Sequence, residues 1–109
     1  MRITKSELYD ILKHLVYDIY IDGDCIEIEY YANGKDCNFN FTARTFEELA
    51  NEIKEVYNNY DIEEELEIYL PMRGKQGVPN SVFNIIKDLE KERDTLKEIY
   101  ETINDYIER

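Results

Sequence analysis

The chain has 109 residues, the usual size of a single domain, and 43% of them are apolar, which is enough to fill one core. Acidic residues outnumber basic ones by 25 to 13, so the formal net charge is -12. Because phosphate contacts need lysine and arginine, this balance disfavours binding to nucleic acid or to an anionic membrane. No apolar run approaches the roughly 18 residues of a spanning helix, and no basic-then-apolar segment opens the chain. We therefore expect a cytoplasmic protein with reduced cysteines.

The N-terminal segment has the pattern of an amphipathic helix. Thr4-Lys5-Ser6-Glu7 has the spacing of a capping box, in which the threonine and glutamate side chains bond to the first free backbone amides. Apolar residues then recur at helical spacing, which predicts a helix from about Thr4 to Tyr17. Its apolar stripe consists of Leu8, Ile11, Leu12, Leu15 and Val16.

The next segment changes to an apolar period of two, which is typical of strands. Ile19 and Ile21 alternate with polar residues before a turn at Asp22-Gly23, and Asn33-Gly34 is the dipeptide most typical of a two-residue hairpin turn. That turn pairs Ala32 with Lys35. The same register places Tyr30–Cys37, Ile28–Phe39 and Ile26–Phe41 on one face, and Glu29–Asn38 and Glu27–Asn40 on the other. It also sends Cys25 and Cys37 to opposite faces, so we expect no disulfide between them.

Three further elements follow. Thr45-Phe46-Glu47-Glu48 is a second capping box and opens a helix that ends near Asn58-Asn59. Leu66, Ile68 and Leu70 alternate with polar residues and predict a strand that Pro71 stops. After a loop from Met72 to Pro79, a helix capped by Asn80 or Ser81 runs to about Ile107. Its stripe is Val82, Ile85, Leu89, Leu96, Ile99, Ile103 and Tyr106, and only Glu92 breaks the series.

The element order α-β-β-β-α-β-α predicts an α+β fold, a single domain over residues 1–109. We expect a mainly antiparallel sheet of three to four strands with helices on one face. The last helix is about 40 Å long, whereas a compact domain of this size is about 34 Å across. It either lies across the sheet or projects and pairs with a second copy. In the second case the chain is a homodimeric interaction or assembly module, acidic for solubility only, with Ile85, Leu89, Leu96, Ile99 and Ile103 at the dimer face.

Enzymatic chemistry finds little support in the residues. Nucleophilic catalysis needs a base beside the nucleophile, and the only histidine is His14, beside the apolar stripe of the first helix. Asp22-Gly23-Asp24, with Glu27 and Glu29 beyond it, lacks the glycine and glutamate spacing of a calcium loop. We expect a non-enzymatic protein without metal or cofactor, and a carboxylate enzyme is the least favoured alternative.

The loop before the last helix is the one basic island in the chain. Arg73 and Lys75 lie among glycines ahead of a helix N-terminus, where backbone donors and the helix dipole favour an anion. The spacing differs from that of a nucleotide-binding phosphate loop. The two cations are therefore candidates for an anion or partner contact, and the alternative is a plain connection from strand to helix.

The most informative feature is the position of the negative charge. Residues 45–70 hold nine acidic residues and one lysine, so they carry most of the net charge. Such crowding costs stability unless something offsets it. It either serves solubility or matches the arginines and lysines with which another protein holds nucleic acid. The candidate partner-binding residues are Glu47, Glu48, Glu52, Glu55, Asp61, Glu63, Glu64, Glu65 and Glu67.

The chain also has ten tyrosines. Codons of an AT-rich genome favour Tyr, Ile, Asn and Lys, and we attribute the tyrosines to that bias rather than to a binding surface.

This acidic tract from Glu47 to Glu67, in a small tyrosine- and isoleucine-rich chain, resembles the phage and mobile-element inhibitors of host defence. These include anti-restriction and anti-CRISPR proteins that mimic DNA. The segment from Arg73 to Pro79 is similar to a loop in small mobile-element proteins of low-GC bacteria. The resemblance implies binding to a Cas9-type nuclease in the bacterial cytoplasm and a block of its basic, PAM-reading groove.

Overall fold

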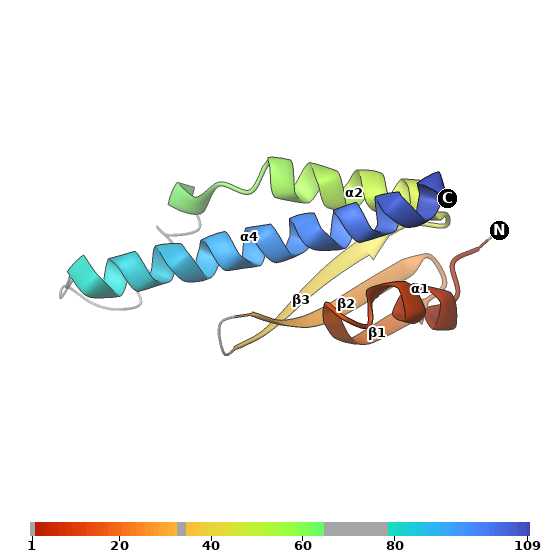
Figure 1. The fold of residues 1–109 in the computed structure, drawn as a ribbon, viewed down its shortest axis with the longest axis horizontal. Helices are drawn as coiled ribbons and strands as arrows, with labels where there is room; N and C mark the ends of the chain where they lie inside the picture. The colour runs from red at the N-terminus through yellow and green to blue at the C-terminus, as the bar shows by residue number, and fades with distance from the viewer. Residues whose placement is uncertain (1, 33–34, 65–78) are drawn as a thin grey trace.

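The chain folds as a short helix, a three-stranded antiparallel sheet and further helices, which confirms the α+β class (Figure 1). The computed structural model describes residues 2–32, 35–64 and 79–109. The strand predicted around Leu66, Ile68 and Leu70 lies outside these residues. The elements are α1 (Lys5–Leu12), β1 (Val16–Asp22), β2 (Cys25–Ala32), β3 (Lys35–Thr42), α2 (Phe46–Asn58) and α4 (Pro79–Glu108).

The first helix is shorter than its apolar stripe predicts, because it ends at Leu12 and not near Tyr17. The Leu15 amide donates to the Leu12 carbonyl at 2.8 Å in the turn that follows. Val16 then pairs with Tyr30 in the sheet. Leu15 and Val16 fit a helical and a strand period equally, and the sheet supplies hydrogen-bond partners that an isolated helix end lacks.

The predicted register of the second hairpin is confirmed in full. Ala32 pairs with Lys35, and the inward and outward pairs follow as expected from the turn. The first hairpin is equally tight, since Asp22 pairs with Cys25 and leaves Gly23 and Asp24 as the turn. Both cysteines are free: Cys25 is exposed, and Cys37 faces the helices and is half-buried.

The strand β1 contains an irregularity that changes which side chains face outward. Its pairing steps from Val16–Tyr30 directly to Asp18–Glu29, so Tyr17 is an extra residue without a partner. Val16 is buried, whereas Tyr17 is exposed and Asp18 half-buried. A bulge of this kind lets two successive side chains lie on the same side of the sheet. Tyr17 and Asp18 therefore both lie on the side away from the core.

The helices α1, α2 and α4 cover the same face of the sheet. Alternate β2 side chains from Ile26 to Ala32 are buried, while Glu27, Glu29 and Tyr31 are partly or fully exposed. The buried set packs with residues of α1, α2 and α4, such as Leu8, Leu49 and Ile99. The other face of the sheet has no helix over it among the described residues.

The helices α2 and α4 run antiparallel, side by side, above the sheet (Figure 1). Two tilted ring pairs join the helices: Phe46 packs against Tyr106 with 4.9 Å between ring centroids, and Tyr57 against Tyr100 with 5.5 Å. The helix α4 begins at Pro79, one residue before the expected caps, where a proline fits the first turn. Its 30 residues run along the 51 Å long axis of the molecule, and its N-terminal part extends past the sheet.

The first hairpin turn yields a test of backbone strain alone. Gly23 has a φ of +62°, and a Cβ atom built there meets nothing within 4 Å. We expect Gly23→Ala to lower the free energy of unfolding by about 1 kcal/mol, because an alanine is strained at positive φ. Gly23→Asn should cost less, since asparagine tolerates this conformation. Urea unfolding of the two variants measures the difference, and equal losses would contradict the explanation.

Candidate functional site

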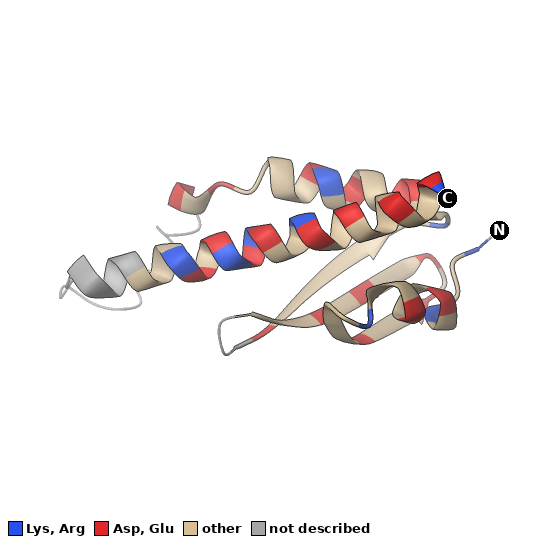
Figure 2. Cartoon of the chain, in the orientation of Figure 1, with Lys and Arg blue, Asp and Glu red and all other residues tan. Residues whose placement is uncertain are grey.

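The acidic residues of α2 lie on its solvent side, as the sequence predicts. Glu47, Glu48 and Glu55 are exposed and Glu52 is half-buried. Figure 2 shows the acidic residues along this helix with a single basic residue, Lys54, among them. Glu48, Glu52 and Glu55 are spaced so that they share one side of the helix, and Glu52 and Glu55 of this set lie beside β3.

Two of these four carboxylates also hold the chain together. Glu48 Oε2 accepts a hydrogen bond from the Arg44 amide, and Glu52 Oε2 accepts one from the Thr42 amide, each at 2.8 Å. The pair fixes the end of β3 and the loop before α2. Glu47 and Glu55 have no such role among the described contacts, so they are the α2 carboxylates best placed for a partner.

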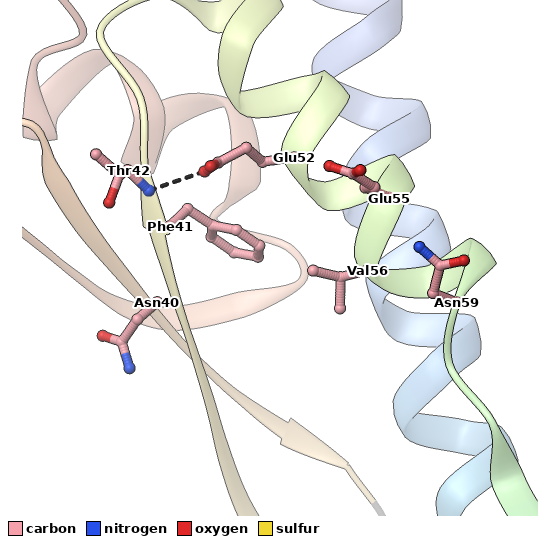
Figure 3. Close-up of a pocket in the computed structure, with 7 residues that line it drawn as sticks. All are labelled: Asn40, Phe41, Thr42, Glu52, Glu55, Val56 and Asn59. Carbon is pink, nitrogen blue, oxygen red and sulfur yellow. Dashed lines mark hydrogen bonds between the residues drawn. The ribbon is translucent and has the colours of Figure 1, made fainter.

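A shallow cleft of about 420 Å³ separates α2 from β3 (Figure 3). The Phe41 and Val56 side chains lie within it, and the bond from the Thr42 amide to Glu52 crosses it. Glu55 and Asn59 line its outer side on α2. The cleft therefore combines an apolar surface with carboxylates, and no lysine or arginine is among its described lining residues.

The rest of the predicted acidic tract is described only in part. Asp61 Oδ1 accepts hydrogen bonds from the amides of Glu63 and Glu64 at 3.0 and 3.2 Å, so it caps the helical residues 62–64 that follow α2. Glu63 and Glu64 themselves are exposed. The remaining candidates lie outside the described residues, namely Glu65 and Glu67 of the tract and Arg73 and Lys75 of the basic loop.

The ion pairs in the described ranges leave the α2 carboxylates without a cation. Arg2 and Arg44 both pair with Asp24, at 3.6 and 3.0 Å. Arg93 pairs with its neighbour Asp94, and Lys5 pairs with Asp18. Basic residues of the N-terminal half are thus used at the turn after β1 and at the edge of the sheet. The crowded charge of α2 is not neutralised by these groups.

A second acidic stripe, on the C-terminal half of α4, was missed by counting charges. Glu98, Glu101, Asp105 and Glu108 are all exposed and recur every three or four residues, opposite the buried stripe. The basic residues elsewhere in residues 81–109 offset these carboxylates in the net charge of the segment, so a count of charges does not reveal the stripe. Helical spacing alone would have revealed it. The negative charge is therefore spread over several faces and is not confined to α2.

This second stripe borders a groove between α1 and α4. One part of the groove, about 260 Å³, is lined by Glu98, Glu101 and Asp105, and a wider part of about 520 Å³ by Glu7, Asp10 and Arg109. The exposed side chain of His14 lines both parts. One basic residue, Arg109, lies among the carboxylates of this groove, unlike the described lining of the cleft beside α2.

The break that Glu92 makes in the α4 stripe has a structural explanation. The Tyr60 hydroxyl donates to Glu92 Oε2 at 2.8 Å, and the Cys37 thiol donates to Oε1 at 3.5 Å. The buried Tyr30 hydroxyl lies near this cluster, since Cys37 and Glu92 both act on its pKa, but it has no hydrogen-bond partner among the described residues. Its burial raises the pKa of Tyr30 far above the ordinary value, and Cys37 and Glu92 raise it further. A glutamate on the inner side of α4 thus ties β3 and the segment after α2 to that helix.

The residues proposed for a dimer face are buried in the interior of the protein. Ile85, Leu89, Leu96, Ile99 and Ile103 are each at most 5% exposed. Leu96, Ile99 and Ile103 belong to the main core. A dimer through this face of α4 would therefore have to draw these side chains out of the chain's own interior.

A small motif at the edge of the sheet shows how this protein holds a cation. Lys5 Nζ lies 3.6 Å from Asp18 Oδ1 and 5.3 Å from the centre of the Tyr20 ring. Carboxylate and ring face attract the ammonium group together. The neighbouring Tyr20 hydroxyl lowers the pKa of Asp18, and Asp18 in turn raises the pKa of Tyr20 to about 12.

The described residues contain no cluster of three or more His, Cys, Asp or Glu side chains fit to hold a metal ion. Among the described helices, none has the length and apolar character needed to cross a membrane. Comparisons of the chain with protein-family models, curated proteins and solved structures found no match.

The bond from Tyr60 to Glu92 can be tested by removing one oxygen atom. We expect Tyr60→Phe to lower the free energy of unfolding by about 1.5 kcal/mol, because a half-buried carboxylate loses a donor. Tyr9→Phe is the matched control, since Tyr9 is exposed on α1. Urea unfolding measures both, and equal stability of the two variants would argue against a structural role for the bond.

The pKa of Tyr20 predicts a loss of stability at high pH. The pKa is about 12 in the folded chain against the ordinary 10, so the unfolded chain loses this proton first. The stabilisation is complete below pH 10 and disappears as the pH rises towards 12. NMR titration of the Tyr20 ring carbons tests the shift. In Asp18→Asn the pKa should fall towards 10, and an unchanged pKa would contradict the assigned cause.

Proposed function

We propose that the protein is a non-enzymatic inhibitor that binds a basic nucleic-acid-handling protein and covers its DNA-binding groove. The observation that carries the proposal is the row of α2 carboxylates without a cation partner in the described chain. Glu47 and Glu55 are exposed and make no bond that the fold requires. Holding such charges together costs stability, and a cationic partner offsets that cost.

The spacing of these groups suits a groove that normally holds phosphates. Carboxylates on successive turns of a helix recur about every 5.4 Å, so they present separate anions to separate arginines and lysines. Arginine recognises carboxylate and phosphate through the same planar fork of donors. A DNA-binding surface can thus accept the carboxylates of α2 in place of the phosphates of a DNA strand.

Among proteins with such a groove, we propose a Cas9-type nuclease of the bacterial cytoplasm as the target. This choice rests on the resemblance to anti-CRISPR proteins. It is also supported chemically, because the arginines that read the PAM are exposed before DNA binds. The protein then acts by competition and needs no cofactor.

Charge reversal on α2 tests the proposal against general electrostatics. We expect the protein to reduce DNA binding by a guide-loaded Cas9-type nuclease, with an affinity that falls steeply as salt rises. The variant Glu47→Lys/Glu55→Lys should bind at least about tenfold more weakly, a change of about 1.4 kcal/mol. Both replaced side chains are exposed, and neither makes a hydrogen bond or ion pair among the described residues, so the fold should persist.

The control carries the same change of charge on α4, as Glu101→Lys/Asp105→Lys, because both side chains are exposed and make no hydrogen bond or ion pair among the described residues. It should lose much less affinity, because only the net charge changes and not the α2 surface. Equal losses in the two variants would indicate attraction by net charge alone. Unchanged affinity of the α2 variant would overturn the role of α2.

A further inference from the structure

The uncovered face of the sheet carries the most exposed aromatic side chains of the described chain. Tyr17 is 48% exposed, Tyr20 47% and Tyr31 63%. Buried or scattered aromatics need no explanation, but three exposed tyrosines on one open sheet face are unusual for a surface that meets only water. Tyrosine is also enriched where proteins bind one another. Codon bias explains the number of tyrosines but not this placement.

The same face is acidic. The register places Glu29 beside Asp18 and Asn38, and Asp36 beside Tyr31. Tyr17 enters this group through the bulge in β1. Partial burial raises the pKa of Tyr17, and the negative charges of Asp36 and Glu29 raise it further.

One end of this face already holds a cation, because Lys5 lies over Tyr20 and beside Asp18. The other end repeats the same chemistry, with two tyrosine rings and two carboxylates. No described side chain places a cation there. The position of Lys5 thus shows that a tyrosine ring beside a carboxylate holds a cation in this protein.

We propose that Tyr17, Tyr31, Glu29 and Asp36 form a docking site for an arginine side chain of a partner protein. A guanidinium group stacks on a tyrosine ring and donates to carboxylates in the same plane, which an ammonium group cannot do. A second copy of this chain is a poor occupant, since it would bring carboxylates against carboxylates. The site lies on the sheet face opposite the one that the helices cover. It goes beyond the proposed role of α2 and does not depend on it.

The test uses peptides as probes, so it needs no identified partner. The full chain, labelled for NMR, is titrated with a short glycine-spaced arginine peptide, with the lysine equivalent, and with a neutral citrulline equivalent. We expect the arginine peptide to shift the signals of Tyr17, Glu29, Tyr31 and Asp36 and to bind at least about tenfold more tightly than the citrulline peptide. The lysine peptide should lie between them.

Two variants complete the experiment. Tyr17→Ser/Tyr31→Ser should abolish the preference for arginine over lysine, whereas Tyr9→Ser, an exposed tyrosine on α1, should leave it unchanged. The fold should persist in both, since these side chains lie outside the core. Equal binding of arginine and lysine by the unaltered chain, or shifts centred on α2 or on the α1–α4 groove, would overturn the proposal. Neither result bears on the α2 charge-reversal test, so the two proposals fail separately.

Discussion

Burial of only one face of the sheet is the constraint on which the rest of the structure depends. A three-stranded sheet needs an apolar cover to be stable, and here α1, α2 and α4 supply it on a single side. Every inward strand position must then be apolar, and every outward position is free to carry other chemistry. Carboxylates and exposed tyrosines stand at these outward positions. The same alternation of inward and outward residues thus produces both the core and the sheet face that we propose for binding arginine.

The sequence predicts most of the sheet because independent features agree there. Asn33-Gly34 requires a register, and the alternation from Ile26 to Phe41 requires the same one. At Leu15 and Val16 the apolar pattern fits a helix and a strand equally well. The pairing of Val16 with Tyr30 places this segment in the sheet. Local pattern therefore predicts an element well where one period fits, and poorly where a partner far along the chain makes the choice.

The candidate site was less accessible from the sequence. Counting charges finds the α2 carboxylates, but it cannot tell that Glu48 and Glu52 bond to backbone amides while Glu47 and Glu55 do not. Nor can it show that Arg2 and Arg44 both pair with Asp24, so that neither pairs with the carboxylates of α2. Glu92 appeared as a flaw in a helical stripe, and only the positions of Tyr60 and Cys37 explain it. Each case depends on which distant groups come together.

Tyr17 is an extra residue in the pairing of β1 with β2. Val16 and Asp18 pair with neighbouring residues of β2, so a chain shorter by this one position would keep every inward contact and gain a regular strand. Folding alone provides no reason to keep it. An insertion that the architecture merely tolerates can be lost without harm to the scaffold. Deletion of Tyr17 would then leave the sheet intact and remove one ring of the site proposed for arginine.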